Sequence, residues 1–267
     1  MSEALKGKWA LILGASSGFG EATALALAEE GMNIFGVHLD LKSTMPHVKE
    51  VISKIEAKGS RAVFFNTNAA DERKRQKVLD KIEKILADDP EDSVYLFMHS
   101  LAFGTLLPFI ADDPEQAVSQ AQMEMTLNVM AHSLVYWVQD IVRRGLFSRG
   151  SRIFAMTSEG SHRVVPGYGA VSAAKAALES HIRQLAMELA PMGVLANCIQ
   201  AGVTVTPALL KIPGHERLVE GAKARHPDGR LTTPQDVANT IAVLCDPRIQ
   251  WISGTVIHVD GGEDVIG

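Results

Sequence analysis

A glycine-rich loop directly after an apolar run is the feature that most constrains the fold of this 267-residue chain. The loop, Gly14-Ala15-Ser16-Ser17-Gly18-Phe19-Gly20, follows the apolar run 9–13 and precedes a helical pattern. Between a strand and a helix, such a loop lets the main chain approach a pyrophosphate, whose charge the helix N-terminus stabilises. We therefore expect a dinucleotide site that includes Gly14, Ser16, Ser17, Gly18, Phe19 and Gly20, rather than a purely structural turn.

Strand-like and helix-like patterns alternate along the whole chain. This alternation predicts one Rossmann-type α/β domain over residues 1–267, with a doubly wound parallel sheet of about seven strands. One long irregular stretch, at about 201–229, follows a strand end, where ligands bind in such sheets. We expect a substrate lid there, with a plain surface loop as the alternative. The expected strands are 9–13, 33–38, 62–66, 94–99, 152–157, 195–200 and 255–259, and helical patterns include 21–30, 73–87, 116–144 and 172–189.

Composition argues against several classes of protein. A net charge of −5 and a pI near 6.0 give no reason to expect nucleic-acid binding. No apolar run approaches the roughly 20 residues that a membrane-spanning helix needs. Cys198 and Cys245 form no CxxC pair, so we expect no disulfide framework and a reducing, cytoplasmic location. The nine histidines show no ligand spacing, so no metal site is expected.

Tyr168 and Lys175 are the strongest candidate catalytic pair. Seven helical positions turn through roughly 700°, close to two full turns, so a helix would bring both side chains to one face. A lysine ammonium beside the phenol is expected to lower the tyrosine pKa and to bind the nicotinamide ribose. The phenol would then stabilise an oxygen on which charge develops after hydride transfer. The alternative is an interfacial tyrosine and an unrelated surface lysine.

The end of the second expected strand bears on the choice between NADPH and NADH. An acidic residue at this place binds the ribose 2′-hydroxyl, whereas a basic group accommodates a 2′-phosphate. His38 and Lys42 favour NADPH, and Asp40 argues for NADH, so the sequence favours NADPH with NADH as the alternative. After the third strand, Asn68 and Ala69 are expected near the adenine, although Asn68 also suits a turn that bonds its own backbone.

These residues resemble the short-chain dehydrogenase/reductase superfamily, and within it the bacterial enoyl-acyl-carrier-protein reductases. The resemblance covers nearly the whole chain. It is carried by the spacing of Tyr168 and Lys175 and by the segment Met98-His99-Ser100-Leu101-Ala102-Phe103-Gly104. The glycine loop and the tail 251–262 resemble the NADPH-dependent, Bacillus-type enoyl reductases in particular.

The resemblance implies roles for further residues by position. Asn128 matches an asparagine that holds a water near the lysine, and Ser158 matches the superfamily's catalytic serine. Many enoyl reductases carry an aromatic residue at the serine position, so Ser158 either bonds substrate or only lines the pocket; a strand-end hydroxyl bonded to backbone is the structural alternative. Cofactor contacts are implied for Ser100, Leu101, Ala102, Lys175, Gly202, Val203 and Thr206.

The implied reaction is reduction of a trans-2-enoyl thioester in fatty acid synthesis, with the acyl chain carried by an acyl-carrier protein. The acyl pocket would be lined by Phe103, Leu106, Leu107, Leu209 and Ile212, and the acidic carrier would meet a basic cluster of Lys211, Arg217, Lys223 and Arg225. Such a cluster is more often simply a solvated helix face, which is the alternative. Another reductase acting on an enoyl-coenzyme A or a carbonyl, and a non-catalytic dinucleotide sensor, are the competing functions.

A homotetramer is expected from surplus apolar surface. The stretch 252–259 and the helical patterns 116–144 and 172–189 carry more apolar residues than one sheet face covers. Apolar faces left over from a monomer core usually indicate a closed symmetric assembly.

Overall fold

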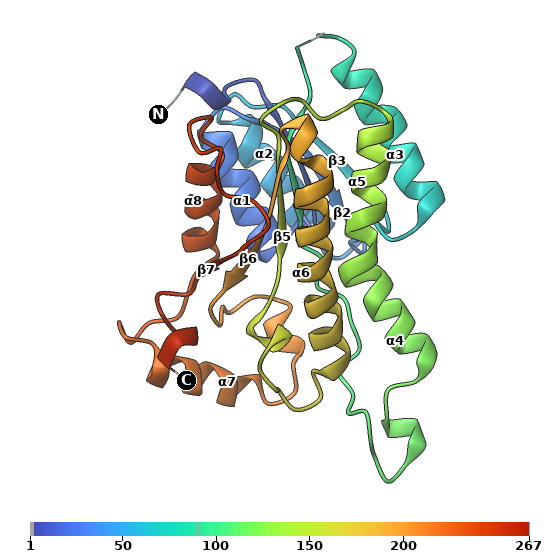
Figure 1. Ribbon diagram of the computed structural model, residues 1–267, viewed down its shortest axis with the longest axis vertical. Helices are drawn as coiled ribbons and strands as arrows, with labels where there is room; N and C mark the ends of the chain where they lie inside the picture. The colour runs from blue at the N-terminus through green and yellow to red at the C-terminus, as the bar shows by residue number, and fades with distance from the viewer. Residues whose placement is uncertain (1–2, 90, 267) are drawn as a thin grey trace.

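A parallel sheet forms the centre of the protein (Figure 1). Its seven strands are paired in the order β3-β2-β1-β4-β5-β6-β7. The computed structural model describes residues 3–89 and 91–266. The predicted α/β class and number of strands are confirmed. The strands are β1 (Trp9–Leu13), β2 (Asn33–His38), β3 (Ala62–Asn66), β4 (Val94–His99), β5 (Arg152–Met156), β6 (Leu195–Ala201) and β7 (Val256–Val259).

Helices cover both faces of the sheet, because the central strands are buried on both sides. On β1, Leu11 packs into the core cluster on one face and Ile12 into the cluster on the other. One layer holds α1 (Gly18–Glu29), α2 (Met45–Glu56) and α8 (Pro234–Leu244). The opposite layer holds α3 (Glu72–Leu86), α4 (Gln120–Leu127), α5 (Ser133–Arg143) and α6 (Gly169–Leu189).

The pattern at 116–144, expected as one helix, is a composite. A capping box at Ser119 begins α4, and a π-helical turn, Asn128–His132, joins α4 to α5. The Ser133 hydroxyl donates to the Val129 carbonyl at 2.8 Å, which satisfies an acceptor within the wide turn. Short 3₁₀ turns lie at Glu3–Leu5, Pro114–Gln116, Glu159–Ser161, Ala190–Met192, Leu209–Lys211 and Asp264–Ile266.

The stretch 201–229 is more regular than the sequence suggested. It contains the short turn Leu209–Lys211 and the helix α7 (His215–Arg225), which lies beyond the carboxyl ends of the strands (Figure 1). Gly214 adopts a left-handed conformation, with φ of 75°, at the start of this helix. The segment is therefore a helical flap rather than an irregular loop, and we retain the substrate lid as a proposal.

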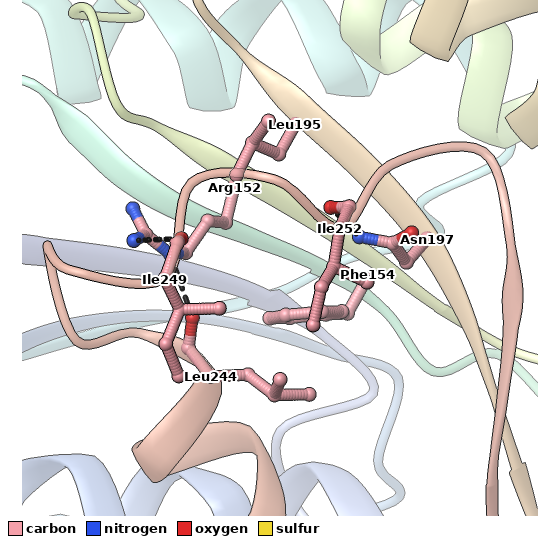
Figure 2. A pocket seen from close by; sticks show the side chains of 7 residues that line it. All are labelled: Arg152, Phe154, Leu195, Asn197, Leu244, Ile249 and Ile252. Carbon is pink, nitrogen blue, oxygen red and sulfur yellow. Dashed lines mark hydrogen bonds between the residues drawn. The ribbon is translucent and has the colours of Figure 1, made fainter.

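Arg152 lies at the opposite end of the sheet, at the amino end of β5. It is fully buried, and its guanidinium donates to the carbonyls of Leu244 and Asp246 and to the Tyr95 hydroxyl, at 2.6 to 2.7 Å. Figure 2 shows this arginine with the other residues that line a cavity of about 10 Å³, which are apolar except for Asn197. A cavity of this size holds at most one water and is too small for a ligand. Arg152 therefore has a structural role, through its hydrogen bonds to the main chain and to Tyr95.

No helix in the described part of the chain is long and apolar enough to cross a membrane. Cys198 and Cys245 are free, buried thiols, and burial raises the pKa of each to about 12. Both are therefore protonated and unreactive near neutral pH.

Candidate cofactor and active site

A cavity of about 680 Å³ opens at the carboxyl ends of the strands. It is lined by residues that follow each of the strands β1 to β6, and by residues of α6 and of the flap at 201–229. Most of the site residues predicted from sequence line it. They are Gly14, Ser16, Ser17, Gly18, Phe19, His38, Asn68, Ala69, Ser100, Leu101, Ala102, Phe103, Leu106, Ser158, Tyr168, Lys175, Gly202, Val203, Thr206, Leu209 and Ile212.

The glycine loop forms a tight cradle against its neighbours. A Cβ on Gly14, where φ is +86°, would lie 2.3 Å from the Ser100 carbonyl oxygen. A Cβ on Gly20 would lie 2.1 Å from the Gly14 carbonyl oxygen, so Gly20 allows close packing although it does not line the cavity. Ser17 makes no side-chain capping bond to α1, which leaves the amides of the first turn to the site. The residues present therefore fit a dinucleotide pyrophosphate.

The end of β2 is fixed by Asn66, which hydrogen-bonds both the amide and the carbonyl of Asp40, at 3.1 and 2.9 Å. His38 Nδ1 donates to Asp40 Oδ2 at 3.0 Å. Burial raises the pKa of Asp40, but hydrogen bonds from Ser16, Thr44 and His38 outweigh it and hold the pKa below its usual value. The carboxylate thus lies between the glycine loop and the end of β2.

Lys42 does not line the cavity and is exposed to solvent. The other sequence-predicted contact on this side, Asn68, lines the cavity and accepts a hydrogen bond from the Ala70 amide at 2.9 Å. Asn68 is therefore a turn residue as well as a wall of the site. The expected adenosine end of the cavity accordingly contains His38, Asn68 and Ala69 without Lys42.

Tyr168 lies directly before α6, and Lys175 lies two turns further along the helix. Gly160, from the loop after β5, packs against the phenol ring, because a Cβ there would lie 2.8 Å from it. Burial raises the pKa of Tyr168, hydrogen bonding with Ser158 opposes this, and the charge of Glu159 adds to the rise. The Ser158 hydroxyl also accepts a hydrogen bond from the Gly160 amide at 3.2 Å. It therefore bonds the backbone after β5, as its structural alternative predicted, and also faces Tyr168.

The expected lowering of the tyrosine pKa by Lys175 is wrong for this structure. The Lys175 ammonium is buried and donates to the Met156 carbonyl at 2.6 Å. Burial lowers the pKa of Lys175 itself to about 8, and the neighbouring Cys198 and Glu179 side chains oppose this only in part. Because burial dominates at both groups, Tyr168 stays a protonated donor at neutral pH.

His99, at the end of β4, supports the helix that carries Asn128. The Ser133 hydroxyl donates to Val129, so it accepts the Nε2 proton of His99, 2.8 Å away. Nδ1 of His99 is buried and has no partner in the described residues. Asn128 begins the π-helical turn but does not line the cavity, so its predicted role near the lysine stays a prediction.

The flap and the loop after β6 close the far side of the cavity. Thr206 approaches the glycine loop, since a Cβ on Gly18 would lie 3.5 Å from its side chain. Leu107, expected in the acyl pocket, is not among the lining residues. Lys211, expected in the basic cluster, lines the cavity. Sequence reasoning missed several lining residues: Met125, Val129, Met130, Glu159 and Leu218.

Only Glu159 among these had a local signal, as an acidic residue directly after Ser158; the others required knowledge of the fold. Burial raises the pKa of Glu159, and the charge of Glu263 adds to the rise.

The expected basic cluster near the lid is smaller than predicted. Lys211, Arg217 and Lys223 are exposed, but Arg225 is half-buried and pairs with Glu263. Arg225 therefore binds the buried carboxylate of Glu263 and does not join the exposed basic cluster.

The chain is similar to known reductases over nearly its whole length. A family model described as Enoyl-(Acyl carrier protein) reductase matches residues 14–263. An Arabidopsis thaliana protein described as an NADPH-dependent aldehyde reductase-like protein, chloroplastic, is 29% identical over 267 residues, covering 97% of this chain and 94% of the relative. An enoyl-acyl-carrier-protein reductase (NADH) of Aquifex aeolicus is 28% identical over 264 residues, covering 98% and 93%.

The solved structures agree with these relatives. The crystal structure of the Aquifex aeolicus enoyl-acyl-carrier-protein reductase (NADH) matches with a TM-score of 0.83 at 26% identity, covering 99% of both chains. The fold is that of oxidoreductases that bind a nicotinamide cofactor. The chain therefore belongs to the short-chain dehydrogenase/reductase superfamily, in the family described as Enoyl-(Acyl carrier protein) reductase, and is an oxidoreductase.

Proposed function

We propose that this protein is an enoyl-acyl-carrier-protein reductase of fatty acid synthesis. The observation that carries the proposal is that Tyr168 and Lys175 line the same cavity as the glycine cradle. A bound reduced nicotinamide would supply hydride to the β-carbon of a trans-2-enoyl thioester. Negative charge then develops on the thioester oxygen, which is the atom that a protonated phenol is suited to stabilise.

Tyr168 is the group proposed to donate to this oxygen, because burial keeps its proton in place at neutral pH. Lys175 provides a positive charge near the ribose and is held by the Met156 carbonyl. The wall lined by Phe103, Leu106, Leu209 and Ile212 is apolar and suits an acyl chain. Exposed Lys211, Arg217 and Lys223 suit an acidic carrier protein, and the proposed site of action is the cytoplasm.

For the hydride donor, we propose NADH, although His38 and Lys42 led the sequence to favour NADPH. Asp40 lies beside Ser16 and accepts from His38, so its carboxylate suits a ribose hydroxyl and repels a phosphate. Neither Asp40 nor exposed Lys42 is among the residues that line the cavity, so the choice rests on the hydrogen bond of Asp40 with Ser16 of the glycine loop. The Aquifex aeolicus relative, whose name specifies NADH, supports the same choice. The NADPH preference stays the competing prediction.

Reduction of a carbonyl is the second candidate, favoured by one specific observation. Ser158 presents a hydroxyl that hydrogen-bonds with Tyr168, and two donors on one oxygen suit a ketone or aldehyde. The Arabidopsis thaliana relative is named as aldehyde reductase-like.

Oxidation of NADH and NADPH, followed at 340 nm with crotonyl thioesters of acyl-carrier protein and coenzyme A and with simple carbonyls, separates these functions. We expect kcat/KM on an enoyl thioester to exceed that on carbonyls by about 10²-fold or more, the scale of one well-placed catalytic group. A preference for carbonyls would favour the second candidate. Tight cofactor binding without turnover on any of these substrates would indicate a dinucleotide sensor.

A further inference from the structure

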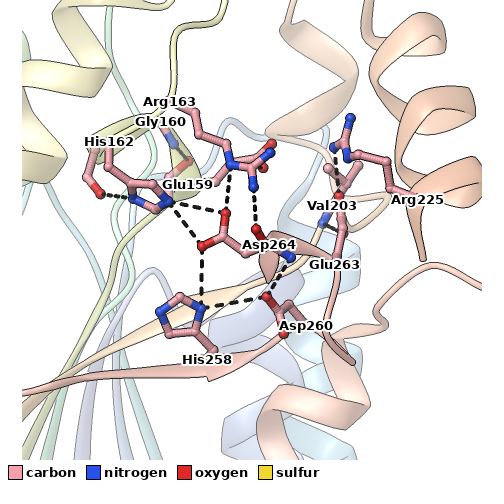
Figure 3. Close-up of polar contacts among 12 residues, drawn as sticks. Glu159, Gly160, His162, Arg163, Val203, Arg225, His258, Asp260, Glu263 and Asp264 are labelled. Carbon is pink, nitrogen blue, oxygen red and sulfur yellow. Dashed lines mark hydrogen bonds and ion pairs between the residues drawn. The ribbon is translucent and has the colours of Figure 1, made fainter. Parts of the chain in front are cut away.

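The turn at residues 260–264 connects two parts of the candidate site. Asp260 accepts from the amides of Gly262 and Asp264, at 2.9 and 3.1 Å, and so fixes the turn. The side chains of Glu263 and Asp264 then point in different directions, as Figure 3 shows. Glu263 faces the loop after β6, and Asp264 faces His162 and Arg163 in the loop after β5.

Glu263 is an almost fully buried carboxylate, 2% exposed, with both oxygens engaged. Oε2 accepts from the Val203 amide at 2.9 Å, and Oε1 accepts from Arg225 Nη2 at 3.1 Å. Burying a carboxylate is costly unless it is paired and hydrogen-bonded. The two bonds together therefore link a main-chain amide at the site with the last turn of α7.

The peptide between Gly202 and Val203 is fixed at both ends by this arrangement. Its carbonyl accepts from the Thr204 hydroxyl at 2.9 Å, while its amide donates to Glu263. Gly202 has no space for a side chain, since a Cβ would lie 2.7 Å from Glu263 Oε2 and 2.4 Å from Thr232 Oγ1. The close approach of the carboxylate thus depends on a glycine at this position.

The position of this peptide in the sheet indicates which half of a dinucleotide it faces. Gly202 and Val203 line the cavity after β6, which neighbours β5, the strand that leads to Ser158. His38, at the adenosine end, belongs to β2 on the other side of β1 and β4. The Gly202–Val203 peptide therefore lies on the side of the cavity that holds the catalytic pair.

We propose that Glu263 is a positioning residue for the nicotinamide half of the cofactor: it fixes the Val203 amide and, through Arg225, joins this loop to α7. The inference rests on the proposed nicotinamide-dependent function. It assigns a function to a carboxylate that touches neither of the proposed reactants. The adjacent Asp264 is a matched control, because it belongs to the same turn and binds histidine and arginine side chains, but makes no bond to Val203.

Binding of two ligands to three variants tests the proposal: Glu263→Ala, Glu263→Gln and Asp264→Asn. The ligands are the preferred reduced dinucleotide and the matching ADP-ribose, which lacks the nicotinamide, titrated by calorimetry. For Glu263→Ala we expect dinucleotide affinity to fall about 10-fold, the scale of one lost bond to a charged group, with ADP-ribose affinity within about twofold. Glu263→Gln keeps an acceptor for Val203 and should recover part of the loss. Asp264→Asn should leave the ratio of the two affinities unchanged.

A direct measurement of the loop accompanies the titrations. Amide hydrogen exchange of a peptide spanning 202–206, without ligand, should be faster in Glu263→Ala and unchanged in Asp264→Asn. Should Glu263→Ala fail to fold, Arg225→Met keeps the Glu263–Val203 bond but removes the link to α7 and the cation beside Glu263. It is expected to weaken dinucleotide binding about threefold, again sparing ADP-ribose.

Equal loss of both ligands, or no loss of either, in a folded variant would overturn the positioning role. A wild-type protein that binds neither ligand would instead refute the cofactor site on which the proposal rests.

Discussion

The buried ammonium of Lys175 donates a hydrogen bond to the main-chain carbonyl of Met156, 2.6 Å away. This bond anchors the lysine at the carboxyl end of β5, one wall of the cavity that also contains Tyr168. The lysine is therefore positioned before any ligand arrives, and its charge is poorly solvated.

Replacement of Lys175 by Met should weaken cofactor binding and lower turnover at pH 7, while raising the melting temperature. The folded-state pKa of Lys175 is lowered to about 8, so below pH 8 the folded protein carries a poorly solvated charge that methionine removes. In the wild type, cofactor affinity should fall as the pH rises through about 8, because the ammonium then loses its proton. Fluorescence titration across pH 6–10 checks this, and pH-independent affinity would place the lysine away from the ribose.

Tyr168→Phe should leave cofactor binding nearly intact and reduce turnover by roughly 10²-fold or more. The phenylalanine ring keeps the contact with Gly160 but removes the hydroxyl that stabilises the developing oxyanion. Ser158→Ala is the informative companion: a comparable loss would assign the serine to substrate, and a small loss would leave it a turn residue. Full activity of Tyr168→Phe on an enoyl thioester would exclude the tyrosine from the mechanism.

Two substitutions at the end of β2 separate the two cofactor predictions. If Asp40 binds the ribose, Asp40→Asn should raise the KM for NADH several-fold and relieve the repulsion of NADPH. If His38 and Lys42 bind a 2′-phosphate, Lys42→Ala should raise the KM for NADPH by about 5- to 30-fold, the scale of a charge-assisted contact, and leave NADH unaffected. Steady-state kinetics with both cofactors decides between them, with wild-type preference as the first measurement.

His99 should make the protein sensitive to acid. Burial, together with the charge of Lys175, lowers the folded-state pKa of His99 to about 3, against an ordinary 6.5. The unfolded chain therefore binds one more proton between these values, and stability present above pH 6.5 is lost progressively as the pH falls towards 3. Urea unfolding of the wild type and of His99→Asn from pH 7 to 4 should show a shallower decline in the variant; parallel declines would contradict the assignment.

A homotetramer remains the proposed assembly. Trp251 is 98% exposed, and Met187 on α6 and Tyr136 on α5 also present apolar surface. Light scattering at micromolar concentration should give four times the chain mass, and Trp251→Glu should reduce it. A wild-type mass of one chain would refute the assembly.

The strands were predictable because the pattern that specifies them is local. The predicted ranges 9–13, 33–38, 62–66 and 94–99 match β1 to β4, and the remaining three strands differ by one residue at an end. Continuous apolar runs bounded by glycine and polar residues are sufficient for such assignments, since both faces of a parallel sheet are buried. The glycine loop and the pair Tyr168–Lys175 were found for a similar reason, as short motifs with fixed spacing.

Tertiary structure alone decided the partners and protonation of the site groups. Lys175 bonds Met156 rather than lowering the pKa of Tyr168, and Arg225 pairs with Glu263 rather than joining the exposed cluster. Each outcome depends on burial and on residues distant in sequence, as Asp40 depends on Asn66 and Ser16. The sequence by itself determined the fold and the chemical groups available, because backbone preference and hydrophobic patterning are local; desolvation and pairing in the cavity exist only once the strands have brought those groups together.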